Sequence, residues 1–369
     1  MIDKQHELCL WVALSQIHGL GGESYRRLLQ SFGEPEHIFA AGYAALENAV
    51  RAPVARLISA GPDLEALTPT LKWLEDPLNH IVTLADTDYP RALLEVPDPP
   101  PLLYVKGQRQ YLNFPALAIV GSRNATPQGL TNAEDFAHLL SDHGLCIVSG
   151  MARGIDGAAH RGGMRGQASS IAVVGTGLDI VYPARHRGLA HELAQKGALV
   201  SEFPLGTPSK AQNFPRRNRL ISGLSRGCLV VEAALRSGSL ITARLAAEQG
   251  REVFAIPGSI HSPLAKGCHH LIKQGAKLVE SAQDILDELG YPSVVASAST
   301  SMPIPASLSK NETLLMQCLG FDPTGIDALV GCSGLTSDSV CAILLTMELA
   351  GYVTSLPGGL YQRSGKFKS

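Results

Sequence analysis

The residues best suited to chemistry lie between Glu202 and Glu232. This span contains five cations and no acidic side chain. Its most concentrated part, 213–219, reads Asn-Phe-Pro-Arg-Arg-Asn-Arg and gathers three arginines around one aromatic ring. Pro215 suits the first turn of a helix, so we expect the cluster at a helix start. Cations for phosphates and a π face for a base are what a single nucleic-acid strand requires.

The alternative interpretation of this cluster is a solvated helix face without a ligand. Solvated faces normally mix charges of both signs, and this span does not. We therefore interpret it as a binding surface. Its candidate residues are Lys210, Phe214, Arg216, Arg217, Asn218 and Arg219.

Glycine-rich turns follow three runs that we expect to be strands. They cover 121–127, 149–156 and 175–179. Ligands of an open α/β sheet bind beyond the carboxyl ends of its strands, and glycines with helix N-termini bring N–H donors close to an anion. Such turns can also merely reverse the chain, but two arginines favour a phosphate-binding rim. Its candidate residues are Gly121, Ser122, Arg123, Gly150 and Arg153.

Signatures of catalysis and of metal or cofactor binding are missing. No G-x-x-x-x-G-K-[ST] motif occurs, and 175–177 lacks the third glycine of the dinucleotide fingerprint. His269 and His270 are adjacent, so on a helix they point about 100° apart and cannot share one metal. Asp156 is expected to organise a turn. We therefore expect no enzyme, no metal and no cofactor. Ser-Gly-Ser at 237–239 is either a further anion-binding helix start or a plain cap.

Six short apolar and β-branched runs alternate with segments long enough for crossover helices. Turn residues bound each run. This repetition predicts an α/β fold, with a parallel sheet covered by helices on both faces. The runs are 118–120, 146–148, 171–174, 199–200, 229–231 and 253–256.

Two smaller modules are expected to flank this central domain of residues 80–290. Residues 1–79 read as short helices, and the Gly-rich turn at 17–22 indicates either a packing module or a phosphate-binding hairpin. Residues 291–309 form a Ser/Pro linker. Residues 310–369 show helical patterns and then two short strands around Pro-Gly-Gly, which is a winged-helix layout. The helical patterns cover 310–319, 324–331 and 336–349.

Composition limits the possible partners and the compartment. The net charge is −2, so a nucleic-acid partner requires a local basic patch. The seven cysteines include no C-x-x-C pair, and several sit in apolar runs, so we expect buried free thiols in a reducing compartment. The N-terminus shows no secretory leader, and no apolar run reaches the ~18 residues of a membrane span. We expect a cytoplasmic protein without a membrane span.

The central motifs resemble the signature blocks of the DprA/Smf family. The resemblance is specific over about 80–290 and looser in the flanking modules, of which the first looks SAM-like. It implies an extended Rossmann-like fold and a homodimer. It also implies a protein that binds single-stranded DNA, protects incoming DNA and loads RecA on it during natural transformation and recombination. The matching blocks are 121–123, 149–160, 214–225, 231–233, 237–243 and 267–272.

The resemblance also implies roles for individual residues. Arg123 would grip a phosphate, Phe214 would stack or pack against a base, and Arg217 with Arg219 would line the pocket. Lys210 lies near the family's expected basic position. The dimer surface, which RecA would use in part, would contain His269, Ile272 and Leu278.

Two further expectations concern the C-terminal module and an enzymatic alternative. Residues 311–362 contain no Lys or Arg, and a DNA-recognition helix needs cations, so we expect this module to contact protein. The alternative function is a nucleotide-processing enzyme of the nucleoside monophosphate hydrolase type. Such enzymes carry a Pro-Gly-Gly-x-Gly-Thr turn, whereas Pro-Gly-Gly occurs here only at 357–359. Glu232 is the one carboxylate suitably placed for that chemistry.

Overall fold

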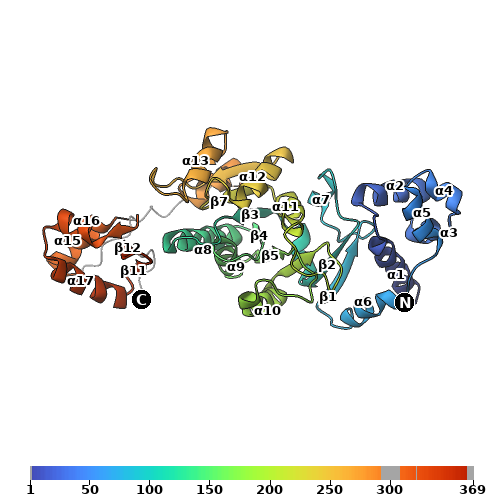
Figure 1. Ribbon diagram of the computed structural model, residues 1–369, viewed down its shortest axis with the longest axis horizontal. Coiled ribbons are helices and arrows are strands. Elements are labelled where there is room, and N and C mark those ends of the chain that lie inside the picture. The colour runs from blue at the N-terminus through green and yellow to red at the C-terminus, as the bar shows by residue number, and fades with distance from the viewer. Residues whose placement is uncertain (1, 292–307, 321, 364–369) are drawn as a thin grey trace.

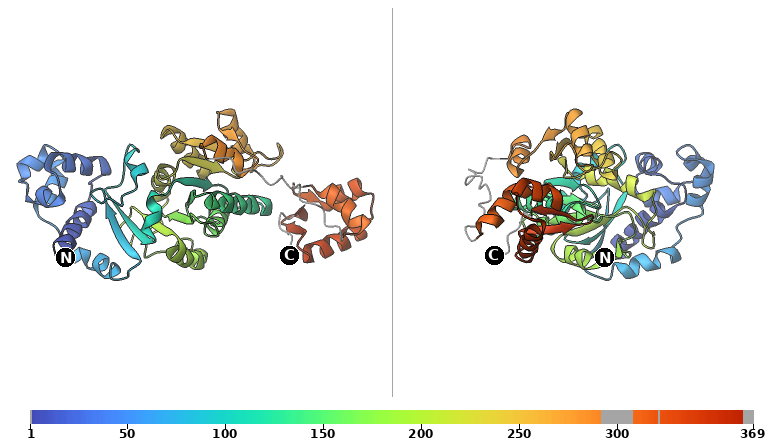
Figure 2. Two further views of the ribbon diagram at one scale, coloured as in Figure 1. Left: turned by 180° about the vertical axis from the view of Figure 1, so that it is seen from behind. Right: turned by 60° about the vertical axis from the view of Figure 1, so that its left-hand side comes forward.

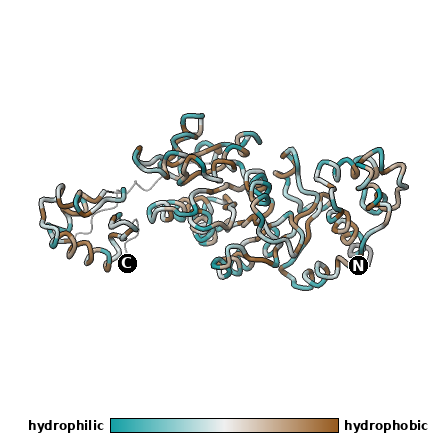
Figure 3. The backbone as a smooth tube through the Cα atoms, viewed as in Figure 1, coloured by the Kyte–Doolittle hydropathy of each residue, from teal (hydrophilic) through white to brown (hydrophobic). Residues whose placement is uncertain are grey.

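The computed structural model describes residues 2–291, 308–320 and 322–363 (Figure 1). An N-terminal group of helices, a central sheet with its helices, and a smaller C-terminal group follow one another along the chain (Figures 1 and 2). Apolar residues concentrate on the strands and on the inner faces of the helices (Figure 3). The sequence-based expectation of an α/β fold with a C-terminal winged helix is confirmed.

A mainly parallel sheet forms the centre of the molecule. Within the described residues it has nine strands in the order β1-β2-β6-β5-β4-β3-β7-β8-β9. The neighbouring strands β6-β5-β4-β3-β7-β8-β9 of this order run parallel to one another, whereas β2 pairs antiparallel with β1 and β6. The six expected runs correspond to β3 through β8. The strands are β1 (Asn79–Thr83), β2 (Leu102–Gly107), β3 (Ala116–Val120), β4 (Cys146–Ser149), β5 (Ser170–Val173), β6 (Ala198–Ser201), β7 (Gly227–Val230), β8 (Glu252–Ala255) and β9 (Lys277–Leu278).

Helices cover both faces of this sheet, as a parallel sheet requires. The adjacent residues Ala118 and Ile119 of β3 face the two opposite helix layers. Ala118 packs in the core cluster of α11, α12 and α13, and Ile119 packs in the cluster of α8, α9 and α14. The helices are α7 (Arg91–Leu94), α8 (Pro127–Asp142), α9 (Ile155–Gly163), α10 (Arg187–Lys196), α11 (Asn213–Gly223), α12 (Gly238–Glu248), α13 (Lys266–Lys273) and α14 (Ala282–Glu288).

The N-terminal helices share a core with one end of the sheet. Trp11 and Tyr25 belong to the same buried cluster as Tyr104 on β2. The expected helix–turn–helix is present, and Gly19 in the turn has φ +81°. The N-terminus of α2 faces the Asp98 carboxylate, which also pairs with Arg26 at 3.6 Å. This internal carboxylate favours the packing role of the hairpin. The helices are α1 (Ile2–Gln16), α2 (Gly22–Phe32), α3 (Pro35–Ala40), α4 (Tyr43–Glu47), α5 (Ala52–Ser59) and α6 (Thr68–Trp73).

The C-terminal group has a small core of its own and the expected winged-helix elements. A disulfide joins Cys318 on α15 to Cys332 on α16. The expectation of free thiols is therefore wrong for this pair, because the fold brings together cysteines that are 14 residues apart. Three other cysteines are free and buried, as expected. The elements are α15 (Lys310–Leu319), β10 (Thr324–Gly325), α16 (Ile326–Ser333), α17 (Ser337–Leu349), β11 (Val353–Leu356) and β12 (Leu360–Arg363).

Within the described residues, no single helix is long and apolar enough to cross a membrane. The pair α16 and α17 passes such a test only when taken together, with a bend of 109° between them.

Close packing of α8 against α9 depends on Gly162, which gives a first prediction. A Cβ at this position would overlap the Glu134 carbonyl oxygen of α8. We expect Gly162→Ala to lower the free energy of unfolding by about 1–3 kcal/mol, as overpacking does. The measurement is urea unfolding followed by circular dichroism.

Gly188 on α10 provides the matched control, because a Cβ there would meet nothing within 4 Å. Gly188→Ala should leave the free energy of unfolding unchanged or raise it by up to about 1 kcal/mol. Equal effects of the two substitutions would contradict the packing argument.

Candidate nucleic-acid interface

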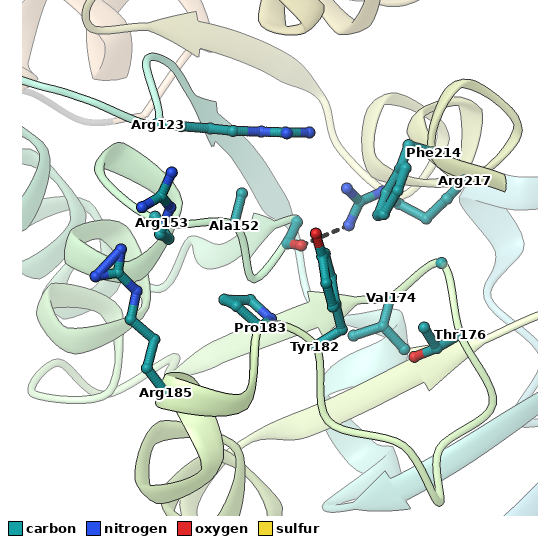
Figure 4. Close-up of a pocket in the computed structure, with 12 residues that line it drawn as sticks. Arg123, Ala152, Arg153, Val174, Thr176, Tyr182, Pro183, Arg185, Phe214 and Arg217 are labelled. Carbon is teal, nitrogen blue, oxygen red and sulfur yellow. Dashed lines mark hydrogen bonds between the residues drawn. The ribbon is translucent and has the colours of Figure 1, made fainter. Parts of the chain in front are cut away.

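A cavity of about 390 Å³ opens beyond the carboxyl ends of β3, β4 and β5 (Figure 4). This is the sheet edge that the glycine-rich turns were expected to occupy. The loops after these three strands and the start of α11 provide its walls. The lining residues are Arg123, Gly150, Ala152, Arg153, Val174, Gly175, Thr176, Tyr182, Pro183, Arg185, Phe214 and Arg217.

One side of the cavity carries three exposed arginines from three different loops. Arg123 follows β3, Arg153 follows β4, and Arg185 lies before α10 (Figure 4). Among the described residues, none of the three has an ion-pair partner, in contrast to twelve other lysines and arginines of the fold. This side is therefore a cationic wall whose charge the protein leaves unneutralised.

The opposite side carries two aromatic rings. Tyr182 and Phe214 have centroids 5.8 Å apart and planes inclined by 41°. The Arg123 guanidinium reaches across the cavity to within 5.8 Å of the Phe214 centroid (Figure 4). A cation at this distance interacts favourably with the face of an aromatic ring. The cavity thus places π faces and unpaired cations within the span of one nucleotide.

Arg217 forms the floor between these walls and is 6% exposed. Its guanidinium donates to the Gly150 carbonyl oxygen at 2.6 Å and to the Val173 carbonyl oxygen. Its Nε donates to Asn218 Oδ1 at 3.2 Å. Burial lowers the pKa of Arg217 to about 10, and Asp156 opposes this shift, so the side chain stays cationic at neutral pH. Arg217 mainly connects the ends of β4 and β5 to α11.

Asp156 organises the turn after β4, as expected. Its Oδ2 accepts hydrogen bonds from the backbone N–H groups of Gly150 at 3.1 Å and Ala152 at 3.2 Å. Between them Met151 adopts φ 60°, a left-handed conformation that is rare for a non-glycine residue. The carboxylate therefore fixes an unfavourable backbone turn directly beneath the cavity.

Two of the expected arginines point elsewhere. Arg216 pairs with Glu202 at 3.0 Å, and Arg219 binds the same carboxylate, whose side chain is 2% exposed. Arg219 also donates to the Asp98 carbonyl oxygen. The expectation that Arg219 lines the pocket is wrong, because its helix position directs it to Glu202 and to the N-terminal helices. Glu202 lies just outside the acid-free span and folds back onto it.

The remaining expected residues divide between the rim and a neighbouring hollow. Gly121, Ser122 and Asn218 line a second cavity of about 660 Å³, which adjoins the first at Arg123 and Phe214. Lys210 is exposed in the loop before α11 and belongs to neither lining.

Sequence reasoning missed Tyr182 and Arg185. The turn after β5 was followed only as far as Asp179, although the chain returns to the same cavity a few residues later. The available signal was the composition of 182–187, Tyr-Pro-Ala-Arg-His-Arg, which places an aromatic ring beside two arginines. His186 anchors this segment, since its Nδ1 lies 2.9 Å from the Met151 carbonyl oxygen.

Glu232 has a structural role in the turn before α8. Its carboxylate accepts hydrogen bonds from Thr126 Oγ1 at 2.6 Å and Thr126 N at 2.9 Å. Burial raises the pKa of Glu232, and these two bonds oppose the shift. The residue lines neither of the two cavities at the arginines. Its geometry offers no support for hydrolysis there.

The comparisons with known proteins identify the family of this chain. A family model described as DNA recombination-mediator protein A matches residues 80–290, which are more than half of the chain. The chain belongs to this family. A model of the DprA winged helix domain matches residues 299–359. The family resemblance noted in the sequence is therefore confirmed.

Individual members of the family cover most of this chain. Protein Smf of Escherichia coli (strain K12) is 41% identical over 356 residues, which are 95% of this chain and 94% of that protein. DNA processing protein DprA of Streptococcus pneumoniae is 47% identical over 209 residues, 57% of this chain and 74% of that protein.

Two solved structures of DprA share the fold. The X-ray structure from Streptococcus pneumoniae has a TM-score of 0.66 at 37% identity, covering 76% of this chain and 97% of that one. A Helicobacter pylori structure, described for its single-stranded DNA binding mode, has a TM-score of 0.52 at 30% identity. It covers 58% of this chain and 98% of that one.

The residues that the DprA resemblance assigns to a dimer surface lie at the far edge of the sheet. Leu278 is 44% exposed on β9, the last strand in the sheet order. His269 and Ile272 lie on α13, which packs against the adjoining β8. Ile272 is partly buried against the core, and His269 Nε2 lies 3.0 Å from the Gly258 carbonyl oxygen. The surface is thus separate from the arginine cavity.

Below the cavity, His160 gives a prediction on pH. This α9 residue is fully buried, and its Nδ1 lies 2.7 Å from Ser170 Oγ. Burial lowers the pKa of His160 to about 3, and His186 and Arg217 add to the shift. The folded state therefore binds fewer protons than the unfolded state, so stability is lost as pH falls from about 6.5 toward 3.

We expect His160→Asn, which keeps a partner for Ser170 but does not titrate, to reduce this acid sensitivity. The difference between the two proteins should reach about 1.4 kcal/mol per pH unit at most. The measurement is the free energy of unfolding at pH 7, 6 and 5. Parallel curves for wild type and variant would refute the role of His160.

Proposed function

We propose that this chain binds single-stranded DNA in the cavity at the carboxyl ends of β3, β4 and β5. The observation that carries the proposal is the pairing of two walls. Arg123, Arg153 and Arg185 form an unneutralised cationic wall, and Tyr182 and Phe214 form an aromatic wall opposite it. Electrostatic attraction to the phosphates and stacking on a base are the two interactions that nonspecific single-strand binding uses.

The partial burial of Phe214 favours a single strand over a duplex. Phe214 is partly buried inside the cavity, whereas Tyr182 is 48% exposed, so a base must leave its own stack to reach the Phe214 ring. In a duplex this unstacking costs a few kcal/mol, whereas an unpaired strand offers its bases freely. The Helicobacter pylori relative, described for its single-stranded DNA binding mode, supports the same assignment.

Family membership supports a proposal for the finer biological role. We propose that the bound strand is protected and transferred to RecA during transformation and recombination, in keeping with the family's description as a recombination mediator. The proposed partner surface for a second copy and for RecA is the β9 edge with Leu278, together with α13. The C-terminal module, without Lys or Arg over 311–362, is proposed to contact protein.

The nucleotide-processing alternative is the weaker proposal. Its candidate acid, Glu232, is engaged with Thr126 and is absent from the lining of the arginine cavity. We therefore propose a binding function without chemistry at this site.

Substitutions at the two walls should affect single-strand binding in different ways. Arg123→Ala and Arg185→Ala should each weaken binding and reduce the slope of log affinity against log salt by about 0.7, the value for one phosphate contact on a single strand. Phe214→Leu should weaken binding by about 1–3 kcal/mol through lost stacking, with an unchanged slope. The measurement is fluorescence anisotropy of a labelled oligothymidylate over a salt series.

Arg165→Ala is the matched control for this series. Arg165 is exposed, pairs with Glu134 at 3.1 Å and lies outside both cavities. Arg165→Ala changes the net charge by the same amount as Arg123→Ala or Arg185→Ala. Its affinity should equal that of the wild type. Wild-type affinity in folded Arg123→Ala and Phe214→Leu proteins would exclude this cavity as the binding site.

The dimer surface is tested by a charge on the sheet edge. We expect the proposed wild-type dimer to be replaced by a monomer in the Leu278→Asp variant in sedimentation equilibrium, because a buried unpaired carboxylate opposes association. Leu94→Asp on α7, where the leucine is 55% exposed, is the control and should not change the mass. A dimeric Leu278→Asp protein would place the interface elsewhere.

A further inference from the structure

The second cavity continues the first around Phe214. Its volume is about 660 Å³, and both cavities include Arg123, Ala152, Phe214 and Arg217 in their linings. Beyond these shared residues the second cavity extends to α12, an element that the first cavity does not reach. Its distant end is formed by Ser-Gly-Ser at 237–239, the segment for which sequence reasoning left anion binding and plain capping open.

The start of α12 has the features of a phosphate site. The helix runs for 11 residues and has no acidic side chain in its first turn. Ser237 Oγ accepts a hydrogen bond from Ser239 N at 3.3 Å, so capping is present. Leu240 N also donates to the Ser237 carbonyl oxygen at 3.2 Å. Among the described residues the Gly238 N–H group has no partner, and the helix dipole favours an anion beside it. Arg236 is exposed at the same opening and has no ion-pair partner among the described residues.

Two buried polar groups independently indicate a ligand. Thr242 is 2% exposed and Asn218 is 9% exposed, and both line this cavity. Within the described part of the chain, the Thr242 hydroxyl has no hydrogen-bond partner. Asn218 uses its Oδ1 to accept from Arg217 Nε at 3.2 Å, and its amide N–H groups make no hydrogen bond within the described residues. Buried polar groups are normally satisfied, so these donors match a bound acceptor.

The remaining wall is largely apolar. Val120, Ile221 and Ile241 contribute aliphatic surface between Phe214 and the start of α12. Asp156 also belongs to the lining, but its Oδ2 accepts two backbone hydrogen bonds and lies beside the Arg217 guanidinium. An anion at the α12 end is therefore separated from this carboxylate by an apolar surface suited to a sugar or a base.

We propose that the second cavity binds the neighbouring nucleotide of the same DNA strand, with a backbone phosphate at the start of α12. Arg236, the Gly238 N–H group and the Thr242 hydroxyl contact this phosphate. Phe214 then stands between two successive nucleotides, and Arg123 lies between their phosphates. The strand passes from the arginine cavity around Phe214 to α12. This inference rests on the proposed function and extends it to a second subsite.

The decisive variant is Gly238→Asp, because Gly238 is exposed and a Cβ there would meet nothing within 4 Å. A carboxylate in the first turn stabilises a helix, so the melting temperature of the full-length protein should be unchanged or higher. The same carboxylate repels a phosphate at this position, so affinity for a 20-nucleotide oligothymidylate should fall by at least about tenfold, the loss of one charge-assisted contact. Opposite changes in stability and affinity distinguish a ligand site from a structural cap.

Two milder substitutions and one control complete the experiment. Arg236→Ala and Thr242→Val should each weaken binding several-fold, and Arg236→Ala should also reduce the salt slope by about 0.7. Arg244→Ala is the control on the same helix, because Arg244 is exposed, lies 3.6 Å from Glu248 and lines neither cavity. It should bind like the wild type.

The outcomes separate this inference from the proposed function. Wild-type affinity in Gly238→Asp and Arg236→Ala, together with weak binding in Arg123→Ala, overturns the second subsite alone. Failure of the wild type to bind any single strand overturns both. The source of the phosphate is tested with inorganic phosphate in a thermal-shift assay. If Gly238→Asp abolishes stabilisation by phosphate but leaves strand affinity intact, the site holds a free anion and the strand proposal is wrong.

Discussion

The geometry of the cavity depends on one buried cation. Arg217 is enclosed by the sheet and donates to carbonyl oxygens at the ends of β4 and β5, and Asp156 lies close enough to support its charge. Removing a charge from water is costly unless polar partners surround it. By satisfying this requirement, the protein fixes α11 against the two strand ends. The position of Phe214 at the start of α11, and with it the aromatic wall, follows from that attachment.

The distribution of charge around α11 then separates binding from support. Glu202 pairs with both Arg216 and Arg219 on one side of the helix, whereas the loops after the strands provide cations that remain unpaired among the described residues. The three arginines of α11, Arg216, Arg217 and Arg219, thus differ in role because of their direction on the fold. The net charge of −2 conceals this difference, since it averages over a surface that is locally cationic at this sheet edge.

Much of the fold could be predicted from the sequence, because parallel strands buried on both faces produce apolar runs of recognisable length. The winged helix was likewise predictable from its helical patterns and its Pro-Gly-Gly turn. The position of Tyr182 in the cavity was not predicted, because the residue lies beyond the glycine-rich turn after β5. Only the path of the following loop brings its ring back to the cavity. The pairing of Arg219 with Glu202 was also hidden, because an acid-free span in sequence does not imply an acid-free surface in space. Cys318 and Cys332 show the same limitation, since only the packing of α15 on α16 reveals their pairing.

The contact between Arg219 and Asp98 has a mechanical consequence. One end of α11 carries Phe214, and Arg219 in its middle is bonded to the segment at Asp98 that lies against the start of α2. This contact fixes one point of α11 relative to the N-terminal helices. The helix that carries the aromatic wall is thereby attached to a module that contributes no residue to the lining of the cavity.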